Sequence, residues 1–198
     1  MLKSNGFMSS LQDRVGKALS FIPLTPNQWT ILSFLVALIS SYFIIKGQFL
    51  QASFFFAIAV LMDAIDGAVA RAKGSVTKFG AFLDGLVDRF VETAVLLSFM
   101  LLNFSDTFYY FGFLFFLIFG TYMTSFVRAY AHHKGLIDEN DCQKMGGLFE
   151  RGERCILLVF VIVSANFNIM YAVYLAYIGA FLSFLTTIQR IFYVYQRK

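Results

Sequence analysis

Residues 62–92 read MDAIDGAVARAKGSVTKFGAFLDGLVDRFVE and place acidic side chains inside two apolar segments. Asp63 and Asp66 lie near the end of the first segment, and Asp84 and Asp88 lie inside the second. A carboxylate in the middle of a membrane helix costs about 2.5–3.5 kcal/mol even on the insertion scale, so four carboxylates need a compensating partner. The stretch therefore predicts a polar site built inside a membrane domain.

The composition of the whole chain indicates that the surrounding solvent is lipid. Of its 198 residues, 59% are hydrophobic and 14% are charged, whereas soluble domains are roughly 45–50% apolar and about 25% charged. These values exclude disorder, nucleic-acid binding and an ordinary soluble enzyme. At about 20 residues per span, the length fits one all-α integral membrane domain over 1–198. We expect six transmembrane helices at 27–45, 50–72, 79–103, 107–133, 149–165 and 168–194.

Residues 1–22 lack the continuous apolar core of a signal peptide. Their apolar side chains instead recur at helical spacing, at Phe7, Leu11, Val15, Leu19 and Ile22. This pattern predicts an amphipathic helix that lies in the membrane interface and precedes a six-helix catalytic bundle over 27–198. A disordered leader is the alternative.

The basic residues outside the spans alternate strongly between the two sides of the membrane. One side carries Lys3, Arg14, Lys17, Arg71, Lys73, Lys78, Lys134, Lys144, Arg151, Arg197 and Lys198, whereas the loops of the other side contain only Lys46. Because cytoplasmic loops are enriched in Lys and Arg, we expect a multi-pass protein of the cell membrane. Both termini and the acidic site would face the cytoplasm.

The four acids are predicted to meet in one cavity. At 1.5 Å per residue, Asp66 and Asp84 lie about 7 Å below the membrane surface, and Asp63 and Asp88 lie about 12–13 Å below it. Spacings of three and four residues keep each pair on one helix face. Carboxylates without nearby His or Cys favour Mg²⁺, with Mn²⁺ as a substitute, and two ions suit a phosphoryl transfer. A structural ion-pair network is the alternative, but few basic residues lie nearby.

These residues follow a longer pattern, Asp63-x-x-Asp66-Gly67-x-x-Ala70-Arg71, then eight residues, then Gly80-x-x-x-Asp84-x-x-x-Asp88. The pattern resembles the motif of the CDP-alcohol phosphotransferase family, in which an acceptor hydroxyl replaces the CMP of a CDP-linked donor. The resemblance implies that Asp63, Asp66 and Asp84 bind one metal ion. It also implies that Asp63, Asp84 and Asp88 surround a second ion, and that Asp88 is the general base.

By the same resemblance, a set of residues around the acids would bind the CDP donor: Asn27, Thr30, Gly67, Ala70, Arg71, Thr77 and Gly80. Asn27 ends the run Thr25-Pro26-Asn27, which is similar to an element that precedes the family's first span. Asn27 would also cap that span. Helix packing is an equally good reason for the small residues Gly67 and Gly80.

Three arginines in the last three predicted spans suggest where an acceptor would bind. Arg128, Arg154 and Arg190 fall in the cytoplasmic halves of these spans, and Lys134 lies nearby. An intramembrane arginine faces a cavity or a partner, and it binds phosphate in bidentate fashion. The alternative is that the arginines snorkel at helix ends. Three runs resemble the branch of the family that accepts inositol 1-phosphate, namely Arg128-Ala-Tyr-Ala131, Glu150-Arg151-Gly-Glu153-Arg154 and Gln189-Arg190.

The resemblance therefore implies transfer of a phosphatidyl-type group from CDP-diacylglycerol or CDP-archaeol to inositol 1-phosphate. It also implies a homodimer. Two enzymatic alternatives stay open, a phosphatidylglycerophosphate synthase that uses glycerol 3-phosphate and a di-myo-inositol-phosphate synthase that uses CDP-inositol. A divalent-cation transporter is a third alternative, but the acids stop about 13 Å from the inner surface, and the outer half of the spans is apolar or aromatic.

Overall fold

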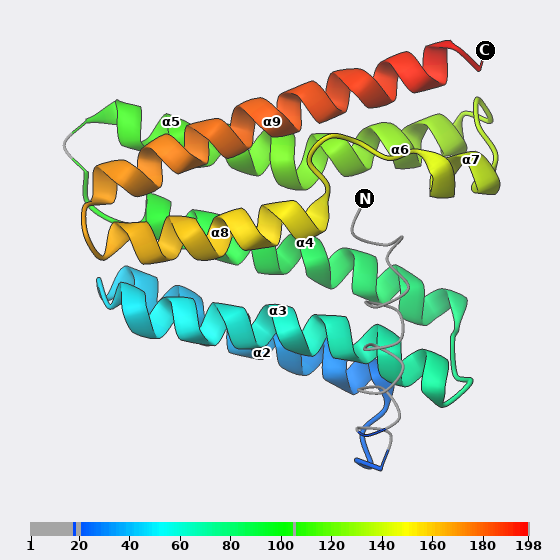
Figure 1. Ribbon diagram of the computed structural model, residues 1–198, viewed down its shortest axis with the longest axis horizontal. Coiled ribbons are helices and arrows are strands. Elements are labelled where there is room, and N and C mark those ends of the chain that lie inside the picture. The colour runs from blue at the N-terminus through cyan, green and yellow to red at the C-terminus, as the bar shows by residue number, and fades with distance from the viewer. Residues whose placement is uncertain (1–17, 19–20, 105, 198) are drawn as a thin grey trace. The chain divides into compact units, whose positions relative to one another are not determined.

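The computed structural model describes residues 18, 21–104 and 106–197, and all regular structure within them is helical (Figure 1). The elements are α2 (Pro26–Ile45), α3 (Phe49–Ala72), α4 (Lys78–Met100), α5 (Thr107–Phe115), η2 (Phe116–Met123), α6 (Thr124–His133), α7 (Glu139–Lys144), α8 (Arg151–Ala165) and α9 (Ile169–Tyr195). The prediction of an all-α protein is confirmed. A helix lies at each of the six predicted ranges, and the short α7 was not predicted. The interfacial helix expected over 1–22 falls almost entirely outside the described residues.

Four helices in the described part of the chain are long and apolar enough to cross a membrane. They are Pro26–Ile45, Phe49–Ala72, Thr107–His133 and Ile169–Tyr195, with mean hydropathies of 1.6–1.8. Helix α4 is less apolar because it carries Asp84, Asp88, Arg89 and Glu92, and α8 has only 15 residues. The protein is therefore a multi-pass membrane protein.

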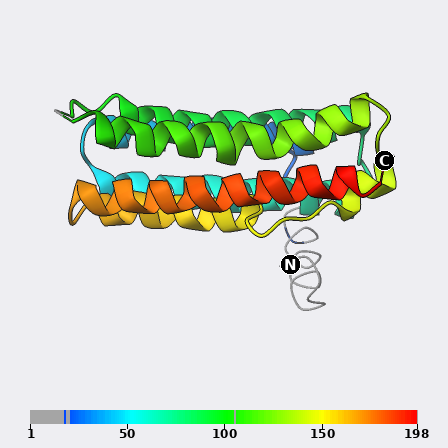
Figure 2. The ribbon, with the colours of Figure 1, turned by 90° about the horizontal axis from the view of Figure 1, so that it is seen from above.

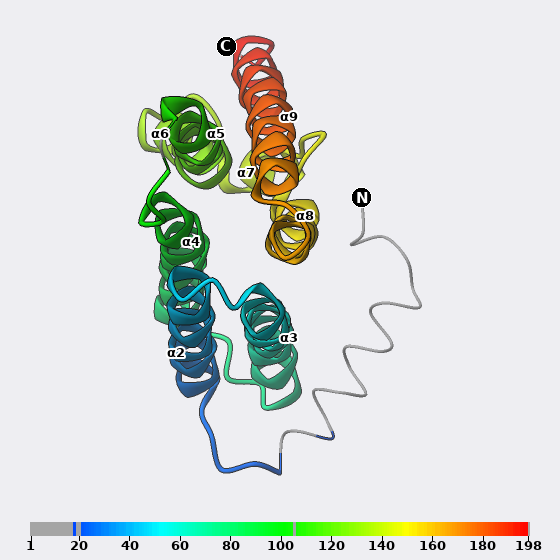
Figure 3. The ribbon, with the colours of Figure 1, turned by 90° about the vertical axis from the view of Figure 1, so that its left-hand side faces the viewer.

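The chain forms two compact units, Met1–Val95 and Leu96–Lys198. In the first unit, α2 and α3 lie side by side as a helical hairpin (Figure 3). Gly47 ends the first arm with a φ of 71°, a left-handed conformation that glycine adopts without a Cβ penalty. Ala37 and Ala52 are fully buried, and the Ser40 hydroxyl donates to the Ala52 carbonyl at 2.7 Å. Small side chains thus allow the two backbones to approach closely.

In the second unit, α9 runs along α8 and along the continuous helix α5–η2–α6 (Figure 2). Glycines permit the close approach. A Cβ on Gly179 would lie 2.6 Å from the ring of Phe116, and a Cβ on Gly112 would lie 3.1 Å from the ring of Tyr177. The Tyr177 hydroxyl also donates to the carbonyl of Phe108 at 3.0 Å. These contacts fix α9 against α5 and the start of η2.

The connection between α6 and α8 is packed at the other end of α9. Ala131, Ile137 and Met145 form a small buried cluster, against which Tyr193 and Val194 pack from α9. An ion pair between Arg197 and Asp141 joins the end of the chain to α7. This packing holds residues 134–150 close to the last turns of α9.

Candidate active site

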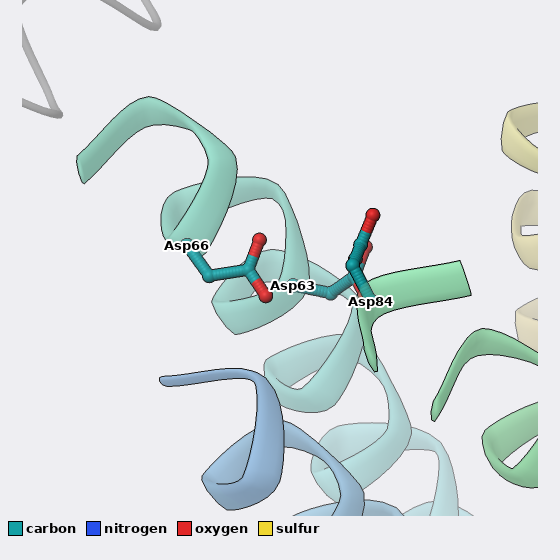
Figure 4. Close-up of side chains that lie close together, drawn as sticks. All are labelled: Asp63, Asp66 and Asp84. Carbon is teal, nitrogen blue, oxygen red and sulfur yellow. The ribbon is translucent and has the colours of Figure 1, made fainter. Parts of the chain in front are cut away.

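Three acidic side chains converge in the first unit. Asp63 and Asp66 project from the last turns of α3, and Asp84 projects from the second turn of α4 (Figure 4). One carboxylate oxygen of each lies within 4.8 Å of the others. Asp66 is buried, and the other two are partly buried. The spacing of three residues on α3 turns Asp63 and Asp66 to one face, and the hairpin between α3 and α4 brings Asp84 to the same place.

This donor set fits a divalent cation. Three carboxylates within 4.8 Å of one another repel strongly unless a positive charge lies between them. Hard cations such as Mg²⁺ and Mn²⁺ take carboxylate oxygens and keep water or phosphate oxygens as their remaining ligands. Partial exposure of Asp63 and Asp84 leaves room for such additional ligands. Asp63, Asp66 and Asp84 are therefore the residues that can hold a metal ion.

Asp88, the fourth acid of the motif, is not one of the three acids whose oxygens lie within 4.8 Å of one another. Asp88 is 5% exposed, and its Oδ2 lies 3.1 Å from a guanidinium nitrogen of Arg89. The same nitrogen donates to the carbonyl of Gly85 at 3.0 Å. Arg89 thus fixes one oxygen of Asp88 in the next turn of α4. Arg89 was not predicted as a site residue, although an arginine beside an intramembrane acid is a signal visible in the sequence.

Three of the predicted donor-binding residues meet at the start of α4. The hydroxyl of Thr77 accepts a hydrogen bond from the Gly80 amide at 2.9 Å, as an N-terminal cap does. A Cβ on Gly80 would lie 3.0 Å from Thr77 Oγ1 and 3.2 Å from Asn27 Oδ1. Elsewhere in the motif, a Cβ on Gly67 would lie 3.4 Å from a guanidinium nitrogen of Arg71. Gly80 therefore keeps two oxygen-bearing side chains accessible to a ligand.

The expectation that Asn27 caps the first span was wrong. Thr25 caps α2 instead, and its hydroxyl accepts from the amide of Gln28 at 3.3 Å. The Thr25 backbone amide in turn donates to Oε1 of Gln28 at 2.8 Å, which completes a capping box. Pro26 occupies the first helical position, where its missing N–H costs nothing. The Asn27 side chain is thereby left to face Gly80.

Thr30, another predicted donor-binding residue, contacts the acid cluster directly. Its hydroxyl lies 2.5 Å from Oδ2 of Asp66, and both side chains are buried. The two residues are 36 positions apart and pair across the α2–α3 hairpin. The remaining predicted donor-binding residue, Ala70, lies on α3 one turn after Asp66.

In the second unit, two of the predicted phosphate-binding arginines hold one loop. Arg128 donates to the carbonyl of Met145 at 2.6 Å, and Arg190 donates to the carbonyl of Gly146 at 3.4 Å and to the carbonyl of Thr124. These bonds join α6 and α9 to the residues that precede α8. The sequence did not reveal them, because they go to backbone atoms.

The other two predicted phosphate-binding residues differ in environment. Arg154 is 2% exposed at the start of α8, and a Cβ on Gly120 of η2 would lie 3.3 Å from its Cδ. Lys134 is exposed just after α6, and its ammonium lies 5.3 Å from the centre of the Tyr130 ring. Arg154 is therefore a buried cation, and Lys134 is a surface one.

The loop before α8 is fixed to α9 by its amides as well. The Leu148 amide donates to the side chain of Gln189 at 2.9 Å, and the Phe149 amide donates to the hydroxyl of Thr186 at 3.0 Å. Gly147 lies between the residues that make these carbonyl and amide contacts, and a Cβ there would overlap Cγ2 of Thr186. Glycine is required at this position for lack of space.

A family model described as CDP-alcohol phosphatidyltransferase matches residues 23–188. The chain belongs to this family. This phosphatidyltransferase is 37% identical to the archaetidylinositol phosphate synthase of Pyrococcus horikoshii over 185 residues, which cover 91% of this chain and 88% of the relative. Membership of the family makes the protein a transferase.

The phosphatidyltransferase also resembles solved structures of the phosphatidylinositol phosphate synthase of Mycobacterium tuberculosis. One, with CDP-DAG bound, matches with a TM-score of 0.78 and 26% identity, covering 94% of each chain. Another, in complex with manganese and citrate, matches with the same TM-score and identity and covers 93% of this chain and 88% of that one. The manganese in that relative and the acid cluster here together indicate that the family depends on a divalent metal.

Proposed function

We propose that this phosphatidyltransferase transfers a phosphatidyl-type group from a CDP-linked lipid to a hydroxyl of inositol 1-phosphate and releases CMP. The observation that carries the proposal is the convergence of Asp63, Asp66 and Asp84 within 4.8 Å, inside the region that the family model matches. The name of the Pyrococcus relative supports an inositol phosphate acceptor, and CDP-DAG in the mycobacterial relative supports a lipid donor.

The acids would hold the metal ions of the reaction. Asp63, Asp66 and Asp84 would bind one Mg²⁺, for which Mn²⁺ would substitute, and Asp63, Asp84 and Asp88 would surround a second. Bound divalent ions neutralise the charge of the donor diphosphate and of the departing CMP. Carboxylates from two helices are suited to this task because the helix backbones hold them close together despite their mutual repulsion.

The start of α4 would bind the nucleotide of the donor. Asn27 and Thr77 would contact it across Gly80, where the missing Cβ leaves space. Arg71, beside Gly67, would donate to the diphosphate oxygens. Ala70 would leave room for the cytidine.

Asp88 would act as the general base. It would take the proton of the acceptor hydroxyl as that oxygen bonds to the donor phosphorus distal to the nucleoside. The bond from this phosphorus to the CMP oxygen breaks, and CMP leaves with the electron pair. Arg89, at 3.1 Å from Oδ2, would keep Asp88 aligned for this transfer.

The cations of the second unit would bind the phosphate of the acceptor. They are Arg128, Lys134, Arg154 and Arg190. Arg154 and Arg190 are only 2% and 5% exposed, and a guanidinium group in such surroundings binds an anion strongly because little water competes for it. A phosphorylated acceptor supplies such an anion, whereas serine has no phosphate and no net charge.

The wider organisation follows from the same proposal. The family match spans both compact units, which supports a single domain over 1–198. We propose that α4 and α8 cross the bilayer with the other four helices, since the 23 residues of α4 extend about 35 Å. The basic loops support a cytoplasmic site and cytoplasmic termini, and the small-residue helix faces allow a homodimer.

The test is release of CMP by the purified protein with Mg²⁺ and either CDP-diacylglycerol or CDP-archaeol. Inositol 1-phosphate, glycerol 3-phosphate, inositol and serine are compared as acceptors. Turnover with inositol 1-phosphate alone is expected, and Asp88→Asn should lower it at least a hundredfold. Turnover with glycerol 3-phosphate alone would contradict the proposal that inositol 1-phosphate is the acceptor. Turnover only with CDP-inositol as donor would contradict the proposal that the donor is a CDP-linked lipid.

A further inference from the structure

The Thr30 hydroxyl makes a contact that links two helices at the acid cluster. Thr30 lies in the second turn of α2 and is 3% exposed, and Asp66 lies near the end of α3 and is 5% exposed. Their oxygens are 2.5 Å apart. That separation is typical of a hydroxyl that donates to a carboxylate, which is among the stronger hydrogen bonds in proteins.

The direction of this bond is fixed by the available proton. The Thr30 hydroxyl also lies 3.1 Å from the carbonyl of Pro26, one turn earlier in its own helix. A hydroxyl carries a single proton and can donate to only one of these acceptors at a time. The Asp66 carboxyl oxygen is nearer, at 2.5 Å against 3.1 Å, so the hydroxyl donates its proton to Asp66. This differs from the usual threonine in a helix, whose hydroxyl bonds back to the carbonyl four residues earlier.

We propose that Thr30 is a positioning residue that sets the orientation of Asp66 as a metal ligand, an inference that rests on the metal site of the proposed function. The bond occupies Oδ2 and stops rotation of the carboxylate about its last side-chain bond. Threonine is itself stiff at χ1 because it is branched at Cβ. The position of Asp66 relative to Asp63 and Asp84 is therefore set by α2, a helix that contributes no carboxylate to the cluster.

A positioning role for Thr30 explains why a polar residue lies at a buried position of α2. Groups that hydrogen-bond a metal ligand typically change metal affinity by about 10–100-fold when they are removed. An alternative is that the bond merely joins α2 to α3, in which case its loss would lower the stability of the protein without changing its metal affinity. Metal binding and stability are thus separate measurements with different outcomes.

The experiment measures Mn²⁺ binding to the purified full-length protein by electron paramagnetic resonance, together with thermal stability in the absence of metal. Thr30→Val keeps the shape of the side chain and removes the hydroxyl, whereas Thr30→Ser keeps the hydroxyl. Ser33→Ala is the matched control, because Ser33 is buried one turn later and its hydroxyl donates at 2.7 Å only to the carbonyl of Thr30 within α2. Thr30→Ala replaces the valine variant if the latter does not fold.

We expect Thr30→Val to weaken Mn²⁺ binding about tenfold, while Thr30→Ser and Ser33→Ala bind within twofold of wild type. Wild-type affinity in the valine variant would overturn the role of Thr30 and leave the metal site intact. Equal weakening in Ser33→Ala would also overturn it, because a general loosening of α2 would then be the cause. Wild-type protein that binds Mn²⁺ no better than Asp84→Asn would overturn the metal site itself.

Discussion

Replacement of Gly147 by alanine tests whether the loop before α8 determines acceptor binding. The new Cβ would overlap Cγ2 of Thr186, whereas its distances to Cβ and Oγ1 of that threonine, 3.4 and 3.6 Å, are ordinary contacts. Gly147 does not have a positive φ, so the backbone accepts alanine and the clash with one methyl group is the whole effect. Overpacking of this kind costs about 1–3 kcal/mol.

The loop rather than α9 is expected to move, because α9 is packed along its length and the loop is held by a few hydrogen bonds. Displacement would disturb the amide bonds to Thr186 and Gln189 and the carbonyl contacts of Arg128 and Arg190. A cost of about 2 kcal/mol corresponds to roughly a thirtyfold change at 1.4 kcal/mol per factor of ten. We therefore expect KM for inositol 1-phosphate to rise roughly thirtyfold, with KM for the CDP-lipid unchanged.

The double variant Gly147→Ala/Thr186→Ser provides the control. Serine removes the clashing methyl and keeps the hydroxyl that accepts from the Phe149 amide. The double variant should regain most of the acceptor affinity, as measured by steady-state CMP release with the acceptor varied. If Gly147→Ala shows wild-type KM values, or if the double variant is no better than the single one, the loop does not position the arginines and the reasoning fails.

Three further outcomes are expected. Gly80→Ala should raise KM for the CDP-lipid, because its Cβ would crowd the oxygens of Thr77 and Asn27, while KM for the acceptor stays constant in the same assay. Removal of divalent ions with a chelator should abolish CMP release, and added Mg²⁺ or Mn²⁺ should restore it; full activity in the chelator would contradict a metal-held diphosphate. Tyr177→Phe should lower stability by about 1 kcal/mol through loss of the hydrogen bond to Phe108, without changing CMP release, and thermal unfolding of both proteins measures this.

The sequence predicted the helices well because length and hydrophobicity determine where a membrane helix forms. It also predicted the convergence of Asp63, Asp66 and Asp84, since helix spacing and a short connection between α3 and α4 leave few alternatives. Its placement of Asp88 in the same cavity stays a prediction, and the ion pair between Asp88 and Arg89 was not predicted. The π-helical segment η2 left no trace in the apolar pattern, because a wider turn changes the hydrogen bonding and not the composition.

Individual contacts between helices could not be predicted from the sequence. The bond from Thr30 to Asp66 depends on how α2 and α3 are rotated about their axes, which hydrophobic periodicity sets only to within a broad face. The bonds from Arg128 and Arg190 go to carbonyls, which every residue has, so no side-chain pattern indicates them. The cap at Thr25 could have been predicted from the sequence, because Thr25 and Gln28 have the residue types and spacing of a capping box.

The most direct test of the account compares Mg²⁺-dependent CMP release from a CDP-linked lipid by wild type, Asp84→Asn and Asp106→Asn, with inositol 1-phosphate as acceptor. Asp84 belongs to the acid cluster, whereas Asp106 only caps α5 through the Phe108 amide, a role that asparagine also fills. We predict that Asp84→Asn loses activity at least a hundredfold and that Asp106→Asn keeps it. Wild-type activity in Asp84→Asn would contradict catalysis by a metal held at the acid cluster.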